Sequence, residues 1–422
     1  MRILHTSDWH LGRLFHGASL RAEHEQVLAR VVELAKAAEV DVVVVAGDLY
    51  DRAIPPADAV HLFGDVLGEL RAVAAHVVAV TGNHDSPARV GSLDPVLRAA
   101  GVTLRGRFAP ESPVVVRDPA GGADVVIHPV PYVEPLALRG LDEPAAGAEP
   151  AASGGRGGDE VAAPRRRRLT QHAAMVWAMD QVRADLAGRA GVRSVVVAHT
   201  FVAGGQGSTS ERELSVGDVD RVGLDAFAGV DCVLLGHLHR AQEWDAGTIG
   251  YSGSLLPCSF AETGPKVVRI VEVDHRGVRA ESVPLGVGRA VRTITGALDD
   301  LVGDPVLVDA EACWVRAVVT DADLPPRAMA ALQARFPHAV ALQHRPVPGT
   351  VVRAVGAAAR RGAGAVSDLD LVLAFLAEQT GRAVTDHERE LVVQALEAQR
   401  TPVDGDDHGS RDVDGATTET AA

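Results

Sequence analysis

At 422 residues the chain is long for one hydrophobic core, so two or three domains are expected, and its 47% apolar residues suffice to fill them. No apolar run approaches the roughly 20 residues of a membrane helix, and a predicted strand begins directly after Met1, which leaves no room for a signal peptide. The net charge of -15 argues against a nucleic-acid partner, although the acidic tail 401–422 contributes -5 of it and bound cations would offset more. The three cysteines are widely spaced and odd in number, which indicates a reducing compartment, and we expect a cytoplasmic protein.

Strand and helix patterns alternate through the first 85 residues, as in layered α/β folds. The run Val42–Val45 is entirely β-branched and is typical of a strand buried on both faces. Helical spacing of apolar residues predicts a helix over Arg21–Ala38, and Pro55-Pro56 begins another. These elements predict a layered α/β fold.

Side chains of the types that bind metal ions follow the apolar runs that are predicted to be strands. Because ligands bind at the carboxyl ends of strands in α/β sheets, we expect these side chains to meet at one edge. Five predicted strands deliver them, and the residues concerned are Asp8, His10, Asp48, Asn83, His84, Asp85, His199, His237 and His239.

The middle of the chain departs from strict alternation. Two β-rich runs within Val114–Val133 flank Gly121-Gly122, so an antiparallel or mixed sheet is expected there. The segment 139–168 is rich in Pro, Gly, Ala and Glu and has no period, which predicts a flexible insertion before the helix Leu169–Leu186. Strands follow at 248–254, 266–273 and 278–283, and the first domain is expected to cover 1–285.

A smaller unit is expected over 286–352, with the order strand, helix, strand, helix, strand. A linker follows at 353–366, two amphipathic helices at 367–400 and a disordered acidic tail at 401–422. Ser367 is a predicted N-cap of the first helix, and Thr385-Asp386-His387-Glu388 is a capping-box pattern at the second. The helices either fold back on their own domain or dock on a partner through apolar faces formed by Leu369, Val372, Leu373, Leu376, Leu391, Val392 and Leu396.

The residue types after the strands indicate metal chemistry. Carboxylate, imidazole and amide oxygen are ligands for borderline-to-hard divalent ions. Two ions roughly 3.5–4 Å apart clamp a phosphate and supply a hydroxide nucleophile, and Asp48 on the central strand is the candidate bridge between them. In an extended chain residues i and i+2 point the same way, so the pairs Asp8/His10 and His237/His239 can each converge on one centre.

Each motif is weak by itself. A Gly-Asp after a strand is usually a turn, and a single histidine such as His199 is more often a hydrogen-bonded core residue. The combination of Gly-Asp, Gly-Asn-His-Asp and Gly-His-x-His, each after a buried-strand pattern, favours a dinuclear metal site over coincidence. Gly47, Gly82 and Gly236 would let the backbone turn sharply after each strand.

At these motifs the chain resembles the calcineurin-like metallophosphoesterases. Within them it is similar to the nuclease subunits that act with an SMC-like ATPase in double-strand-break repair. The segments that carry this likeness are Met1–Gly12, Val45–Asp51, Gly236–Gln242 and Gly253–Phe260. The resemblance covers nearly the whole chain, except the insertion and the acidic tail. It implies a layered β-sandwich flanked by helices over 1–285, a small α+β capping domain over 286–352 and a C-terminal helical pair over 367–400.

The resemblance implies roles for single residues. One metal would be held by Asp8, His10, Asp48 and His239, and the other by Asp48, Asn83, His199 and His237. Two manganese ions are implied, with magnesium as a substitute. His84 would face the scissile phosphate as a catalytic residue, and Asp85 would support His84.

The resemblance also implies 3′-to-5′ exonuclease action on duplex ends and endonuclease action on single strands and hairpins. The helical pair would dock on the ATPase, and a homodimer within a heterotetramer is expected, with no membrane. Two other functions stay open from the residues: hydrolysis of a small phosphomonoester or cyclic nucleotide on the same core, and tethering of DNA ends with incidental nuclease activity.

Overall fold

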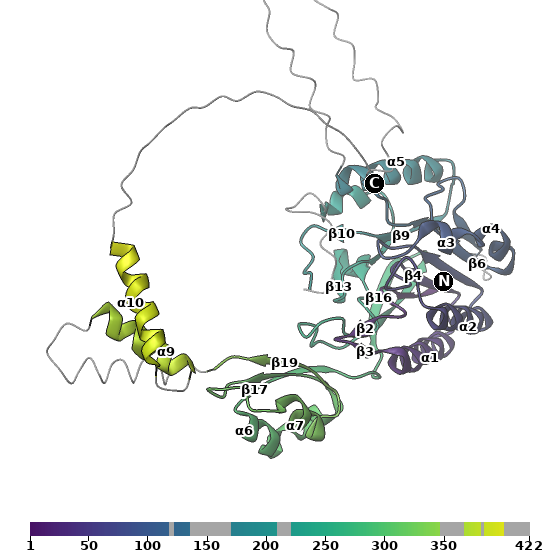
Figure 1. Ribbon diagram of the computed structural model, residues 1–422. Helices are drawn as coiled ribbons and strands as arrows, with labels where there is room; N and C mark the ends of the chain where they lie inside the picture. Colours follow the sequence, from purple (N-terminus) through teal and green to yellow (C-terminus); the bar gives the residue numbers. More distant parts are fainter. Residues whose placement is uncertain (118–121, 136–169, 209–220, 347–366, 381–383, 401–422) are drawn as a thin grey trace, which may run out of the picture. The chain divides into compact units, whose positions relative to one another are not determined.

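A computed structural model of the chain describes residues 1–117, 122–135, 170–208, 221–346, 367–380 and 384–400 (Figure 1). Residues 1–319 and 324–344 form one compact unit, and the helical pair belongs to a second. The expected insertion 139–168, the linker 353–366 and the acidic tail 401–422 lie outside the described residues.

The larger part of the first unit is a sandwich of two six-stranded sheets. In the first sheet β1, β4, β5 and β6 are parallel, and β15 and β16 continue it in antiparallel pairing. Its strands in spatial order are β16 (Gly277–Pro284), β15 (Val267–Asp274), β1 (Arg2–Thr6), β4 (Val42–Ala46), β5 (His76–Val80) and β6 (Val102–Arg105).

The second sheet also has a parallel centre, but it carries one antiparallel strand at each edge. Its strands in spatial order are β13 (Gln242–Trp244), β14 (Ile249–Tyr251), β12 (Cys232–Gly236), β9 (Arg193–His199), β8 (Val125–Val130) and β7 (Val114–Val116). The antiparallel pairing of β7 with β8 confirms the expectation for that part of the chain.

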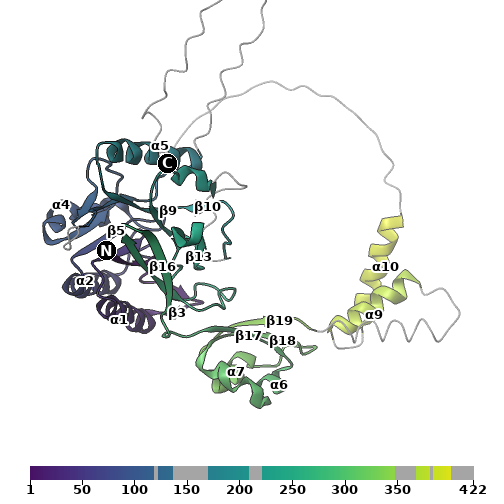
Figure 2. The same cartoon turned by 180° about the vertical axis from the view of Figure 1, so that it is seen from behind.

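Helices cover both outer faces of the sandwich, as Figures 1 and 2 show. α1 (Arg21–Ala37) and α2 (Ala57–Val73) pack on the first sheet, and α5 (Gln171–Ala187) packs on the second. In β4, Val42 and Val44 face the other sheet while Val43 and Val45 face the helices, so every side chain of the run is buried. This explains why the strand is β-branched throughout: both of its faces are covered by apolar layers.

Several short elements join these layers. Near the site they are the hairpin β2 (Leu14–Phe15) and β3 (Ala18–Ser19), and the pair β10 (Phe201–Val202) and β11 (Arg221–Val222). The other short elements are α3 (Pro87–Gly91), α4 (Asp94–Leu97), η1 (Arg98–Ala100), η4 (Leu224–Phe227) and η5 (Asp245–Gly247).

The smaller unit expected from the sequence, which is part of the first compact unit, has the predicted order of strands and helices. Its three strands form a parallel sheet. Figure 2 shows its helices on one face of that sheet. Two contacts join it to the sandwich. The rings of Trp314 and Phe15 lie with their centroids 5.8 Å apart, and Arg289 forms an ion pair with Glu23 of α1. The elements are β17 (Val291–Gly296), α6 (Leu298–Gly303), η6 (Pro305–Ala312), β18 (Trp314–Val319), α7 (Ala328–Arg335) and β19 (Ala339–His344).

The C-terminal helices are α9 (Asp368–Thr380) and α10 (Asp386–Arg400), which contact each other. Ser367 Oγ accepts a hydrogen bond from the Asp370 N–H at 3.2 Å. Thr385 and Glu388 cap α10 reciprocally, through Thr385 N–H to Glu388 Oε2 at 2.9 Å and Glu388 N–H to Thr385 Oγ1 at 3.3 Å. Both predicted N-caps are therefore confirmed. Among the described residues, none of the helices has the length and apolar character required to cross a bilayer.

Candidate metal centre

The predicted ligands lie at the carboxyl ends of parallel strands, where the two sheets face each other. Asp8, Asp48 and Asn83 follow β1, β4 and β5 of the first sheet, whereas His199 ends β9 and His237 follows β12 of the second. The edge expected from the sequence is therefore shared by two sheets. β4 packs directly on β9 and β12, which brings the two sets of strand ends together.

The backbone at the ligands adopts left-handed conformations that few side chains tolerate. Asp8, His10 and Asp48 have φ values of 52°, 47° and 49°, and His237 has a φ of 113°. Strained residues of this kind cost about 1–3 kcal/mol each and cluster at functional sites. The positive φ values also overturn one premise from the sequence, because neither pair of ligands lies in extended chain.

Hydrogen bonds between loops hold these conformations. The Asp8 N–H donates to the Gly47 carbonyl and the His10 N–H to the Asp48 carbonyl, each at 3.0 Å. Gly47 has a φ of +95°, as a sharp turn requires. Gly82 is required for a different reason from the expected turn: a Cβ atom at this position would collide with Asp48.

Four side chains form the first group of donors. Asn83 Oδ1 lies 3.0 Å from His199 Nε2 and 3.1 Å from His237 Nδ1. Asp48 Oδ2 lies 3.5 Å from the same His199 nitrogen. His199 Nδ1 donates to the Ala46 carbonyl at 2.8 Å, which leaves Nε2 to face the group. These are the four residues expected for one metal.

The second group surrounds His10. Its Nε2 lies 3.1 Å from His239 Nε2 and 3.7 Å from Asp48 Oδ2. Asp8 accepts the backbone N–H of His237 on both carboxylate oxygens, at 3.1 Å each, and one of these oxygens lies within 4.8 Å of donor atoms of Asp48 and His199. A single oxygen of Asp48 thus lies beside an imidazole of each group, which is the position that a shared ligand needs. His237 and His239 face different groups, so the expected convergence of that pair on one centre is wrong.

Burial and neighbouring charges set the protonation of the site. Burial lowers the pKa of His237 to about 3 and that of His10 well below its usual value, so both rings are neutral donors at neutral pH. Burial alone would lower the pKa of His199, but the Asp48 carboxylate raises it to about 9. His199 in turn holds the pKa of Asp48 well below its usual range, against the effect of burial. In the metal-free protein a proton on His199 therefore balances the Asp48 charge.

His84 lies beside the groups and is half-buried. Its backbone N–H donates to Asp48 Oδ1 at 2.9 Å, and its Nδ1 donates to the Asp51 carbonyl at 2.9 Å. The ring is 4.8 Å from the His10 ring, measured between centroids. His84 is thus fixed next to the donors through Nδ1, with Nε2 left as the second ring nitrogen.

Asp85 has different partners from those expected. It was expected to support His84, but its carboxylate accepts the backbone N–H groups of Leu49, Tyr50 and Gly82, at 3.0, 2.9 and 2.9 Å. It therefore ties the loop after β4 to the loop after β5. Burial and the Asp48 charge raise its pKa to about 7, whereas the three N–H donors favour the carboxylate.

Three residues in the site lacked a signal that singled them out in the sequence. Asp51 Oδ1 lies 3.6 Å from His10 Nδ1, and Glu262 Oε1 lies 3.6 Å from His239 Nδ1. A carboxylate on the outer nitrogen of a ligating imidazole fixes the ring and raises its basicity. Cys258 is the third: its sulfur and one nitrogen each of His10 and His239 lie within 4.8 Å of one another. The Gly253–Phe260 segment contained Cys258, but no spacing rule marked the thiol.

The donors fit divalent cations. They combine two carboxylates, an amide oxygen and imidazoles, which is the set that borderline-to-hard ions prefer. Asn83 is aligned through Oδ1, while its buried Nδ2 finds no hydrogen-bond partner among the described residues. Nitrogen and oxygen atoms that converge at close range in a buried site are stabilised when a cation lies among them.

This α/β sandwich, with a buried set of metal-type donors at its strand ends, defines a metal-dependent phosphoesterase. The chain belongs to the calcineurin-like phosphoesterase family, a family of hydrolases, whose model matches residues 1–241.

Similarity to a relative gives more detail. The chain is 29% identical over 312 residues to the SbcD subunit of the nuclease SbcCD from Staphylococcus saprophyticus, which covers 73% of this chain and 75% of the relative. With the family match, this similarity supports a calcineurin-like phosphoesterase of the SbcD type.

Two of the solved structures that resemble the chain come from a bacterium and a fish. One is a protein of Thermus thermophilus, with 16% identity, a TM-score of 0.37 and coverage of 67% of this chain and 98% of that protein. Another is a dimetal phosphatase from Danio rerio, with 15% identity, a TM-score of 0.35 and coverage of 68% of this chain and 99% of that protein.

Proposed function

We propose that the chain is a metal-dependent DNA phosphodiesterase, with 3′-to-5′ exonuclease activity on duplex ends and endonuclease activity on single strands and hairpins. The observation that carries the proposal is Asp48 Oδ2, which lies 3.5 Å from His199 Nε2 and 3.7 Å from His10 Nε2. One carboxylate oxygen between two sets of donors is what a centre with two cations needs. Similarity to a protein named as part of a nuclease supports DNA as the substrate.

We propose two manganese ions, with magnesium as a substitute. Asp8, His10, Asp48 and His239 would hold one, and Asp48, Asn83, His199 and His237 the other. When bound, such a pair polarises the phosphate and lowers the pKa of a water molecule to yield a nucleophile. The carboxylates of Asp51 and Glu262 lie behind the rings of His10 and His239, each 3.6 Å from Nδ1, where their negative charge would strengthen the rings as donors.

His84 is the proposed catalytic side chain. The Asp51 carbonyl accepts from its Nδ1, so Nε2 is the nitrogen available to a phosphate oxygen or to the leaving oxygen. There it would stabilise developing charge or donate a proton. Arg13 and Arg52 flank Asp51, and the Arg52 side chain is 75% exposed. Their positive charge around Asp51, whose carbonyl holds His84, suits a phosphate backbone despite the net charge of the chain.

The proposed partner is an SMC-like ATPase of the SbcC type, held by α9 and α10. The apolar residues expected to dock differ in exposure: Leu373 is buried, whereas Leu391 is 51% exposed. Phe375, which was not among the expected docking residues, is 56% exposed. Exposed apolar side chains on a helical pair suit a partner helix, and Leu373 instead packs inside the unit.

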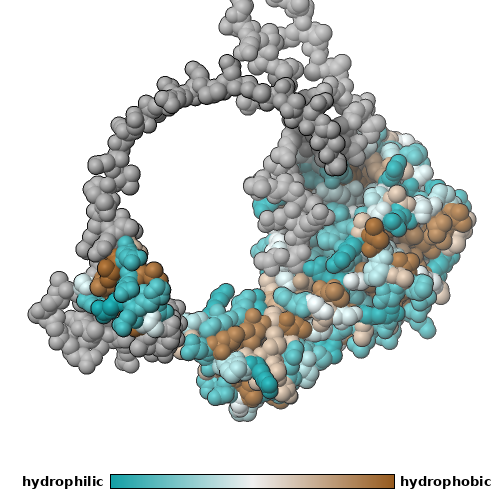
Figure 3. Space-filling view, in the orientation of Figure 1, coloured by the Kyte–Doolittle hydropathy of each residue, from teal (hydrophilic) through white to brown (hydrophobic). Residues whose placement is uncertain are grey.

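A homodimer within a heterotetramer is proposed for the assembly. Figure 3 shows hydrophobic residues gathered where α4 lies, and Leu93 and Val96 there are 60% and 72% exposed. Leu93 lines an apolar groove of about 610 Å³ between α2 and the α3–α4 segment. A patch of this kind is typical of an interface between copies of one chain.

The deciding experiment offers the pure chain with manganese several substrates: duplex ends labelled on either strand, hairpins, circular single-stranded DNA, a cyclic nucleotide and a phosphomonoester. We expect cleavage of DNA, and loss of cleavage in Asp48→Asn. Turnover of the cyclic nucleotide or the monoester without DNA cleavage would instead establish a small-molecule phosphoesterase. DNA binding without hydrolysis of any substrate would establish a tethering scaffold.

A further inference from the structure

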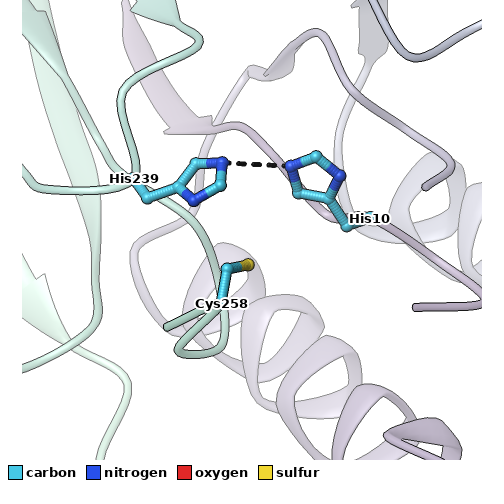
Figure 4. Close-up of side chains that lie close together, drawn as sticks. All are labelled: His10, His239 and Cys258. Atoms are coloured by element: carbon cyan, nitrogen blue, oxygen red, sulfur yellow. Dashed lines mark hydrogen bonds between the residues drawn. The ribbon is translucent and has the colours of Figure 1, made fainter. Parts of the chain in front are cut away.

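Cys258 enters the site from a segment that contributes none of the proposed ligands. It follows β14, whereas His10 follows β1 and His239 follows β12. Figure 4 shows the two imidazoles facing each other, with the Cys258 side chain beside them. One donor atom from each of the three side chains lies within 4.8 Å of the other two.

The two imidazoles present the same nitrogen to this space. His10 Nδ1 and His239 Nδ1 each face a carboxylate, that of Asp51 and that of Glu262, both at 3.6 Å. Both Nε2 atoms therefore point inward, and they lie only 3.1 Å apart. Nitrogen atoms of two rings on one ion lie at about this separation, given metal–nitrogen bonds of about 2.0–2.1 Å.

Glu262 positions the cysteine as well as the histidine. Its Oε2 accepts the Cys258 backbone N–H at 3.2 Å, and the Lys266 ammonium at 2.6 Å holds the same oxygen. Glu262 is 3% exposed, so this support is rigid and shielded from water. The Cys258 side chain is half-buried, and rotation about its Cα–Cβ bond moves the sulfur without disturbing that backbone contact.

We propose that Cys258 is an additional, thiolate ligand of the cation held by His10 and His239, so that this position takes thiophilic divalent ions such as zinc, cobalt and cadmium. On binding, the S–H bond breaks, the proton passes to solvent and a sulfur–metal bond forms. Thiolate ligands select softer ions, whereas the amide and carboxylate donors of the Asn83 group do not. The inference rests on the proposed metal centre. It implies that the two metal positions of that centre prefer different ions.

Cobalt is the probe, because a thiolate on Co²⁺ gives a near-ultraviolet charge-transfer band and any bound Co²⁺ gives visible d–d bands. We expect both bands in the intact chain, and loss of the charge-transfer band alone in Cys258→Ser. Cys313→Ser is the matched control: Cys313 is also half-buried but lies at the end of η6, and the band is expected to persist.

Zinc affinity provides a second readout that does not depend on activity. We expect Cys258→Ser to weaken zinc binding by at least about tenfold relative to manganese binding, and Cys313→Ser to leave the ratio unchanged. Visible bands without a charge-transfer band in the intact chain would overturn the role of Cys258 and leave the metal centre standing. Absence of both bands would overturn the metal centre itself.

Discussion

His84 and the ligands around it differ in what they contact. Asn83, next to it in sequence, lies against two other donors, whereas Nδ1 of the His84 ring is held by the Asp51 carbonyl, and one ring nitrogen of His84 lies within 4.8 Å of donor atoms of His10 and Asp48. Asp48 links His84 to the donor groups. One of its carboxylate oxygens accepts the backbone N–H of His84, and the other oxygen faces the imidazoles. Adjacent residues thus have separable functions, and substitution can distinguish them.

We predict that His84→Gln keeps both cations but reduces cleavage roughly 100- to 10,000-fold, because it removes a proton donor and no ligand. Manganese stoichiometry by isothermal titration calorimetry and cleavage of a labelled duplex measure the two effects. Asn83→Ala is the companion variant, in which we expect the stoichiometry to fall. Loss of metal from His84→Gln would assign the ring to the ligands instead.

Metal affinity is predicted to rise with pH. The pKa of His199 is raised to about 9 by Asp48, so below that pH the metal-free ring holds a proton that a cation must displace. Affinity then increases about tenfold per pH unit for each proton released, up to the pKa of the ring. Titrations between pH 6.5 and 8, in buffers of different ionisation enthalpy, count the protons. A pH-independent affinity with no proton release would contradict the protonated His199.

The sequence pointed to the proposed ligands because each one ends, or closely follows, a strand with an apolar run. It could not predict the residues behind them. Asp51, Cys258 and Glu262 come from loops, and their approach to the imidazoles depends on left-handed backbone at the ligands, as at His10 and Asp48. The same conformations explain why the extended-chain argument for paired ligands was wrong.

At the level of elements, burial on two faces made the fold predictable. β4 carries apolar residues at every position and β9 carries an apolar run over Val195–Ala198, and the helices beside them carry one apolar face. The short elements were not predicted, because β2, β3 and β10 have two residues each and take their structure from the loops they join. Apolar runs look alike in both sheets, so the pattern could not assign a strand to one sheet or the other.

The helical pair carries its own signals for structure, since side-chain caps begin both helices and Leu373 is buried. We predict that deletion of 367–400 abolishes co-purification with the ATPase while hydrolysis of small diesters persists. The double variant Phe375→Ser, Leu391→Ser is expected to have the same effect, because it removes two exposed apolar side chains and leaves Leu373 in place.

Gln394→Ala is the matched control for this surface, since Gln394 is an exposed polar residue of α10. Co-purification of that variant together with loss in the double variant assigns docking to the apolar face. Circular dichroism of the variants checks that the helices still form. If the deleted chain still co-purified with the ATPase, the helices would have only a structural role.

At the scale of the whole molecule, the exposed apolar surface is unevenly distributed. Leu93 and Val96 lie together beside the α2 groove, whereas Val306 and Val308 project from η6 of the smaller unit. Both pairs are similarly exposed, at 60% and 72% against 73% and 57%. Leu93 of the first pair also lines a hollow with further apolar side chains, such as Phe63 and Leu67. Shape as well as hydrophobicity therefore favours the first as the dimer interface.

We predict that Leu93→Glu with Val96→Glu converts a dimer into a monomer, because a two-fold interface repeats each change and would bury four carboxylates without partners. Light scattering coupled to size-exclusion chromatography measures the mass of each species. Val306→Glu with Val308→Glu adds the same charge elsewhere and is expected to remain a dimer. Manganese stoichiometry should be unchanged in both variants, since the ligands come from strand ends within one chain. A dimer that persists in the first variant, or a monomer in the unsubstituted chain, would show that this groove does not join two copies.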